Sequence, residues 1–294
     1  MKQSGYILKL SCPDQPGIVH AVSGFLFEQG CNILDSAQFG DTQLAEEPGA
    51  GRFFMRVYFS PVNGGQGLED IRARFAPVGA KFSMDWEMFD DSVRPRLLVM
   101  VSKTGHCLND LLFRARSGAL PVDIAAIASN HTEFRDLAAS YGIPFHHLPL
   151  LNASPEQKAA QEAQVMRIVE QEAIDLVVLA RYMQILSADL CGRLAGRAIN
   201  IHHSFLPSFK GAQPYYQAHE RGVKLIGATA HYVTASLDEG PIIDQDVARV
   251  DHAMGPEQLS AIGRDVECVT LARAVKWHAE HRILINGSKT VVFN

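Results

Sequence analysis

A change in hydrophobic pattern near Pro95 divides this chain into two parts that must fold differently. Before it, short strand-like and helix-like segments alternate, and each is apolar on one face only. After it, continuous apolar runs alternate with amphipathic helices, which is typical of a parallel sheet covered by helices on both faces. Three of these runs are Arg96–Val101, Val122–Ala128 and Leu176–Ala180. We therefore expect an α/β protein with domains at residues 1–88 and 96–294, joined by a polar linker at residues 89–95.

The first part predicts six elements in the order βαββαβ, which favours a ferredoxin-like sandwich. Asp14 is placed to cap the first helix, with Pro16 in its first turn, and Gly30 is placed to end it. The expected strands cover residues 6–10, 32–39, 52–59 and 81–88, and the helices carry Ile18, Val22, Phe25, Leu26 and Leu68, Ile71, Phe75.

The second part predicts a doubly wound, mostly parallel, Rossmann-like sheet. A helix is expected over His131 to Ser140, and the sequence Ser154-Pro155-Glu156-Gln157 is a capping box for another. At the end of the chain, Ile283 to Phe293 should form a hairpin. Ligands of doubly wound sheets bind beyond the carboxyl ends of the strands, and Asn200 to His203 lie at such an end.

The composition of the chain bears on its partners and on its cellular location. Its 294 residues carry a net charge of −5 and no basic run, so no nucleic-acid partner is expected. No apolar stretch is long enough to cross a bilayer, and no signal peptide is recognisable. The five cysteines are scattered and never form a C-x-x-C pair, which indicates reduced thiols in the cytoplasm.

Three polar residues form a candidate catalytic set. Asn200 and His202 lie two apart on an expected strand, so their side chains share one face. Asp238 would join them from a separate loop. An amide, an imidazole and a carboxylate can stabilise an oxyanion, hold a proton and orient a nucleophile, as acyl transfer requires. The paired histidines of the chain lack metal-ligand spacing, so no metal is expected.

The segment Cys12-Pro-Asp-Gln-Pro-Gly-Ile-Val19, followed by Gly30-Cys-Asn-Ile33, resembles the ACT domain family. ACT domains often bind amino acids between paired copies. The resemblance implies a homodimer or homotetramer, and an amino-acid effector held by Asp14, Gly17, Ile18 and Asn32. The alternative is that this domain serves only for association between copies.

From Arg96 onward the chain resembles the folate-dependent formyltransferase superfamily. The motif is Asn200-Ile-His-x-Ser-x-Leu-Pro207, followed by Gly211, His231 and Leu237-Asp-x-Gly-Pro241. Joined to an ACT-like domain, it resembles the formyltetrahydrofolate deformylases. This implies hydrolysis of 10-formyltetrahydrofolate to tetrahydrofolate and formate, with the folate as substrate and no cofactor. It further implies a role in one-carbon balance and in formate supply for purine synthesis.

The resemblance also implies a role for each site residue. Asn200 and His202 would stabilise the formyl oxyanion, and Asp238 would orient and activate water. His231 and His203 would support this set. The reduced folate would be bound by residues of two loops, namely Met183, Gln184, Ile185, Leu186, Val233, Thr234 and Ser236.

The acceptor of the formyl group is the remaining question. Transformylases that use a phosphorylated amine carry a Gly- and Ser-rich turn after the first strand, whereas here the turn reads Ser102-Lys-Thr-Gly-His-Cys-Leu-Asn109. This segment resembles the deformylases and favours water. The alternatives are a formyltransferase similar to the glycinamide-ribonucleotide transformylases, and a non-catalytic regulator that binds folate or an amino acid.

Overall fold

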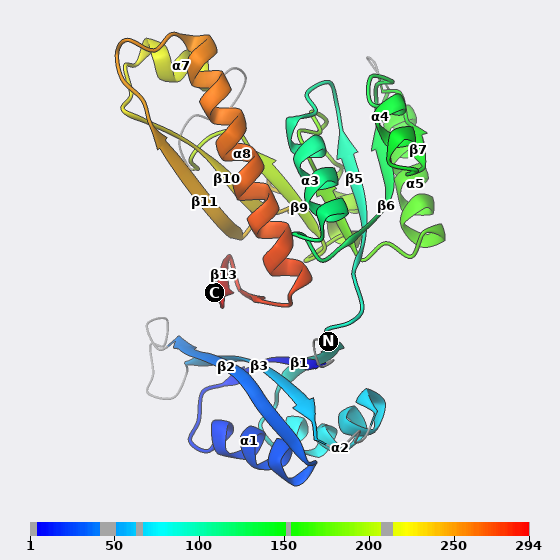
Figure 1. Ribbon diagram of the computed structural model, residues 1–294, viewed down its shortest axis with the longest axis vertical. Helices are drawn as coiled ribbons and strands as arrows, with labels where there is room; N and C mark the ends of the chain where they lie inside the picture. Colours follow the sequence, from blue (N-terminus) through cyan, green and yellow to red (C-terminus); the bar gives the residue numbers. More distant parts are fainter. Residues whose placement is uncertain (1–4, 42–50, 63–66, 151–153, 207–213, 294) are drawn as a thin grey trace. The chain divides into compact units, whose positions relative to one another are not determined.

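The computed structural model describes residues 5–41, 51–62, 67–150, 154–206 and 214–293 (Figure 1). The chain forms two compact units. The first comprises Met1–Arg94 with Glu280–Asn286 and Thr290–Asn294, and the second comprises Pro95–Ala279 with Gly287–Lys289. The division expected from sequence gave the whole of 96–294 to the second domain. Within the described ranges, no helix combines the length and apolar character needed to cross a membrane.

The first unit has the expected βαββαβ order. Two helices lie on one face of a four-stranded antiparallel sheet whose strand order is β2-β3-β1-β4 (Figure 1). The apolar residues expected on its first helix are all buried there. The elements are β1 Tyr6–Pro13, α1 Ile18–Glu28, β2 Cys31–Asp41, β3 Arg52–Pro61, α2 Leu68–Lys81 and β4 Asp85–Asp90.

Two details of this unit differ from expectation. Asp14 does not cap α1, because the helix begins after Gly17, which has a φ of 93° and provides no side-chain cap. The backbone N–H of Asp14 instead donates to the carbonyl of Gly51 at 2.8 Å. The last strand begins at Asp85 rather than at residue 81, because α2 continues to Lys81. Gly30 follows α1 with a φ of 67°, as a helix-ending glycine should.

The second unit contains a seven-stranded sheet with the order β11-β10-β9-β8-β5-β6-β7. The strands from β9 to β7 are parallel, and β10 runs antiparallel to both β9 and β11. The sheet is therefore mostly parallel, as expected. The elements are β5 Arg96–Val101, α3 His106–Ser117, β6 Asp123–Ser129, α4 Arg135–Ser140, β7 Phe145–His147, α5 Pro155–Gln171, β8 Leu176–Leu179, α6 Ala188–Arg193, β9 Ala198–His202, α7 Pro214–Glu220, β10 Leu225–Tyr232, β11 Ile242–Arg249 and α8 Pro256–Ala279.

Helices cover both faces of this sheet. On one face, Leu98 and Met100 of β5 pack with Val165 and Val169 of α5 in a buried cluster. On the other, α8 packs against β9, β10 and β11 and α3 packs against α8. The capping box at Ser154 and Gln157 is present. Helix α4 begins only at Arg135, so the expected start at His131 is wrong.

The strand order fixes where a ligand can bind. The chain moves from β5 through β6 to β7 in one direction and from β8 to β9 in the other, so the topological switch point lies between β5 and β8. A crevice forms outside the carboxyl ends of the strands at such a point. The turns that begin at Ser102 and Arg181 meet there, since the Ser102 N–H donates to the Arg181 carbonyl at 3.2 Å.

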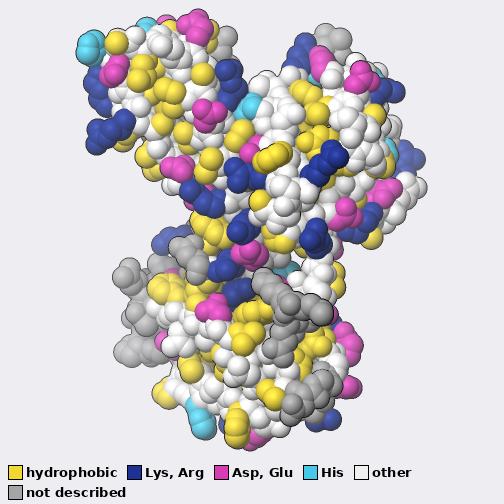
Figure 2. Space-filling model, viewed as in Figure 1, with side chains coloured by type: hydrophobic (Ala, Val, Ile, Leu, Met, Phe, Trp, Pro, Cys, Tyr) yellow, Lys and Arg dark blue, Asp and Glu magenta, His cyan; other side chains and the backbone are white. Residues whose placement is uncertain are grey.

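On the face drawn in Figure 2, basic and acidic side chains are interspersed over each unit.

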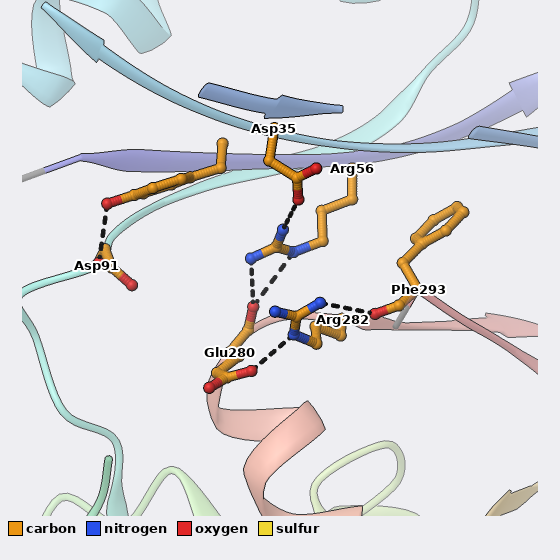
Figure 3. Close-up of polar contacts among 7 residues, drawn as sticks. Asp35, Arg56, Asp91, Glu280, Arg282 and Phe293 are labelled. Atoms are coloured by element: carbon orange, nitrogen blue, oxygen red, sulfur yellow. Dashed lines mark hydrogen bonds and ion pairs between the residues drawn. The ribbon is translucent and has the colours of Figure 1, made fainter. Parts of the chain in front are cut away.

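The C-terminal segment completes the first unit. The expected hairpin forms from β12 Ile283–Asn286 and β13 Lys289–Val292. Leu284 and Phe293 pack on Phe54 of β3, on the sheet face opposite the helices. The buried guanidinium of Arg56 donates to the Glu280 carbonyl at 3.3 and 3.0 Å and contacts Asp35 at 3.4 Å (Figure 3). Residues from the far end of the chain therefore cover a sheet face that the N-terminal segment leaves open.

Candidate active site

One cavity of about 240 Å³ in the second unit gathers the residues expected to carry the chemistry. It lies at the carboxyl edge of the sheet, between the turn after β8 and the loop after β10. Its lining includes all the expected catalytic and supporting side chains and all the expected substrate contacts: Asn200, His202, His203, His231, Asp238, Met183, Gln184, Ile185, Leu186, Val233, Thr234 and Ser236. Pro207 and Gly211 of the motif lie outside the described residues.

The pairing of β9 with β10 sets the first contacts. His231 lies opposite Asn200 in the antiparallel register, next to a β-bulge between β10 and β11. Bulges re-aim side chains and are frequent beside active sites. The His231 Nδ1–H donates to the Tyr232 carbonyl at 2.9 Å, so in the neutral ring Nε2 can accept from Asn200 Nδ2 at 3.2 Å. This fixes the Asn200 amide and leaves its second N–H for a ligand.

Asp238 is held by a tight loop in a left-handed conformation with a φ of 55°. The loop returns to β10 because the Tyr232 N–H donates to the Pro241 carbonyl at 2.9 Å. Gly240 is required at this crossing, since a Cβ there would lie 1.8 Å from the Tyr232 carbonyl oxygen. The Asp238 carboxylate then lies 3.3 Å from His202 Nδ1 and 3.7 Å from His231 Nε2.

The electrostatics of this set favour an ionised carboxylate. The hydrogen bond from His202 and the contact with His231 hold the pKa of Asp238 well below its usual range, although partial burial opposes this. With Nδ1 of His202 directed at Asp238, the buried Nε2 has no hydrogen-bond partner among the described residues. The cavity therefore presents an amide N–H, an imidazole nitrogen and a carboxylate to one ligand, which is the requirement for acyl transfer.

The walls beside this set are apolar and accessible. Met183 and Ile185 are 58% and 61% exposed, so they are available to a ligand and do not fill the core. Leu186 and Val233 pack partly against the buried cluster below them. Apolar walls with a few polar groups suit a flat heteroaromatic ring.

His203 stacks beside His202, with ring centroids 5.1 Å apart and an angle of 22° between the rings. Burial, followed by the charge of Arg181 and then that of His202, lowers the pKa of His203 to about 4. The imidazole is therefore neutral near neutral pH. Such a ring can pack or accept a hydrogen bond, but it is a poor source of protons.

A buried polar network behind His203 was not foreseen from the sequence. Glu267 of α8 contacts His106 Nε2 at 2.7 Å, Tyr215 Oη at 2.6 Å and Arg181 Nε at 3.4 Å. These residues come from four separate elements or turns, so no local spacing marks them as a group. The only visible signal is His106 in the altered turn after the first apolar strand.

The described residues contain one group of potential metal ligands. Side-chain atoms of His106, Cys107 and Cys268 lie within 4.8 Å of one another. The hydrogen bond with Cys268 and then burial raise the pKa of the Cys107 thiol well above its usual range.

The pKa of His203 predicts a dependence of stability on pH. Because the folded-state pKa of about 4 lies below the unfolded value near 6.5, the unfolded chain takes up this proton first. The stabilisation is complete above about pH 6.5 and is lost as the pH falls towards 4. Relative to His203→Gln, the wild type should lose up to about 2 kcal/mol of unfolding free energy between pH 7 and pH 5. Urea denaturation of both proteins at both pH values measures this, and parallel pH profiles would contradict it.

Comparison with known proteins shows the family of the chain. Residues 95–275 match the formyl transferase family and residues 6–75 match the ACT domain family. The formyltetrahydrofolate deformylase of Corynebacterium sp. (strain P-1) is 50% identical over 99% of both chains. The crystal structure of the Burkholderia mallei ATCC 23344 formyltetrahydrofolate deformylase is 52% identical, with a TM-score of 0.92 over 99% of this chain and 100% of that one. Glycinamide ribonucleotide transformylase 1 from Symbiobacterium toebii is 31% identical, with a TM-score of 0.64, and covers 68% of this chain and 95% of its own. The chain belongs to the formyltetrahydrofolate deformylase family.

Proposed function

We propose that this protein hydrolyses 10-formyltetrahydrofolate to tetrahydrofolate and formate. The observation that carries the proposal is the ionised Asp238 carboxylate, fixed against His202 in a cavity that also presents Asn200. Relatives that match this chain over nearly its whole length are named formyltetrahydrofolate deformylases. Their names support the choice of substrate and of water as the acceptor.

The roles of the residues follow from where charge develops. Attack on the formyl carbon places negative charge on its oxygen, towards which the free N–H of Asn200 and a protonated His202 would donate. One such donor lowers the barrier by about 2.7–4 kcal/mol. Asp238 accepts a hydrogen bond from the attacking water and takes up its proton as the new C–O bond forms. The C–N10 bond then breaks, and N10 gains a proton to give tetrahydrofolate.

His231 and His203 act as supports in this scheme. His231 holds the Asn200 amide at 3.2 Å and lies 3.7 Å from Asp238, so it positions both groups. His203 packs on His202 as a neutral ring. The pterin would lie against the exposed faces of Met183 and Ile185, with Gln184, Leu186, Val233, Thr234 and Ser236 completing its site. The reaction uses the folate as substrate and needs no further cofactor.

Product analysis tests the proposed function. Purified protein mixed with 10-formyltetrahydrofolate and no amine should release formate and tetrahydrofolate in equal amounts. Asp238→Asn and His202→Ala should each lower turnover by several orders of magnitude with little change in folate affinity, because both groups act mainly in the transition state.

Glu239→Gln is the matched control, since it removes a charge next to Asp238 from an exposed side chain. It should retain activity near that of the wild type. Tetrahydrofolate that forms only when a ribonucleotide amine is added, with the formyl group on that amine and no formate released, would show a transformylase instead. Folate binding without turnover by the wild type would show a regulator.

The first unit supports a proposal about association. Asp14 lies next to the β1–β3 end where Pro13 pairs with Arg52, whereas Asn32 pairs with Ser60 at the other end of β3. Eight residues of strand separate these points, or about 27 Å. Ile18 is only 2% exposed and belongs to the core. We propose that a site using Asp14, the exposed Gly17 and Asn32 forms between two copies, which makes the protein a homodimer or homotetramer.

An effector site between copies has a measurable consequence. Equilibrium dialysis with glycine and with methionine should show binding of one of these amino acids to the wild type. Asp14→Ala and Asn32→Ala should each weaken this binding, because each removes one half of the shared site. Binding that neither substitution alters would refute this placement.

The cellular role follows from the proposed reaction. Hydrolysis returns tetrahydrofolate to the one-carbon pool and releases formate, which purine synthesis can use. Cys12, Cys31, Cys107, Cys191 and Cys268 are all free thiols, which is compatible with the reducing cytoplasm that we propose as its location.

A further inference from the structure

Arg181 has a backbone conformation that ordinarily selects glycine. It follows β8 at the topological switch point and has a φ of 64°. A left-handed conformation is strained for a residue with a Cβ. The conformation is imposed by neighbours, because the Arg181 carbonyl accepts from the Ser102 N–H at 3.2 Å and the Met183 N–H donates to Ser102 Oγ at 3.0 Å. Glycine would fit this turn with less strain, so the arginine side chain must have a use.

The guanidinium of Arg181 is fixed by a buried carboxylate. Its Nε lies 3.4 Å from Glu267, whose side chain is 1% exposed. Burial by itself would raise the pKa of Glu267. The hydrogen bond from His106, the charge of Arg181 and the hydrogen bond from Tyr215 together lower this pKa by more, so its net shift is downward. An ionised Glu267 therefore anchors the arginine from behind the cavity wall.

Arg181 also belongs to the lining of the catalytic cavity. Arg181, His202 and His203 all contribute to its lining. The buried Nε and Nη1 of Arg181 make no hydrogen bond to any described residue. The charge of Arg181 acts on the neighbouring His203, whose pKa it lowers, so a fixed positive charge lies close to the catalytic set.

A fixed cation distinguishes between two classes of acceptor. An amine that attacks a formyl carbon develops positive charge on its nitrogen, and a nearby guanidinium raises the energy of that state. Water can pass its proton to Asp238 while it attacks, so no positive charge remains on the nucleophile.

We propose that Arg181, held by Glu267, makes the site specific for water by barring amine acceptors. This inference rests on the proposed hydrolysis of 10-formyltetrahydrofolate and names the residue that selects its acceptor. Arg181 is in this account a specificity-determining residue, whereas Asp238, His202 and Asn200 carry the chemistry.

Arg181→Gly and Arg181→Met test this with hydroxylamine as the probe. In the transfer reaction, the C–N10 bond breaks and the hydroxylamine nitrogen bonds to the formyl carbon. The nitrogen loses one proton, N10 gains one, and formohydroxamate forms in place of formate. The ratio of formohydroxamate to formate should rise at least tenfold in both variants relative to the wild type. Glycine suits the left-handed turn, and methionine keeps bulk without charge.

Two controls match these changes. Ala173→Gly places glycine at another left-handed position of the same unit, with a φ of 47°, and should keep the wild-type product ratio. Arg181→Lys keeps the positive charge and should also stay near that ratio.

Three outcomes separate this inference from the proposed function. Hydrolysis by both Arg181→Gly and Arg181→Met with an unchanged product ratio would overturn the inference. Loss of all turnover in both, with folate binding retained, would overturn it as well, since Arg181 would then act in the chemistry. Absence of formate release by the wild type would instead contradict the proposed function.

Discussion

The antiparallel pairing of β10 with β9 places His231 opposite Asn200 and Thr229 opposite His202. Because side chains alternate along a strand, a slip of β10 by one residue would turn His231 away from Asn200 and from the cavity. The pairing also secures the chain beyond β9, since Thr229 Oγ1 accepts from the Leu206 N–H and donates to the Ser204 carbonyl. This one register therefore orders the amide, the imidazole and the segment that follows them.

Two carboxylates near the β9–β10 pair have different electrostatic roles. Asp238 faces the cavity with its pKa held well below the usual range by His202 and His231. Glu267 lies behind the wall, where His106, Tyr215 and Arg181 surround it. The first carboxylate would accept the proton of water, and the second would fix a cation at the cavity edge. In this proposal the choice between water and an amine depends on buried charge.

Much of the site was predictable because it depends on local spacing. Asn200 and His202 lie two residues apart on a strand, Asp238 lies in a recognisable Gly-Pro loop, and all three line one cavity. The network around Glu267 escaped prediction because its members are far apart in sequence. Spacing likewise could not reveal that the backbone of Arg181 is in the left-handed conformation. Nor could it reveal that Asp14 and Asn32 lie beside opposite ends of β3.

In the proposed reaction, water attacks the formyl carbon directly and Asp238 accepts its proton. A single turnover in ¹⁸O-enriched water, with enzyme in excess over 10-formyltetrahydrofolate, tests this most directly. We expect formate that carries one ¹⁸O atom, one tetrahydrofolate for each formate, and no label in Asp238. Unlabelled formate with ¹⁸O in the Asp238 carboxylate would contradict it, because the formyl group would then have passed through a covalent bond to that side chain.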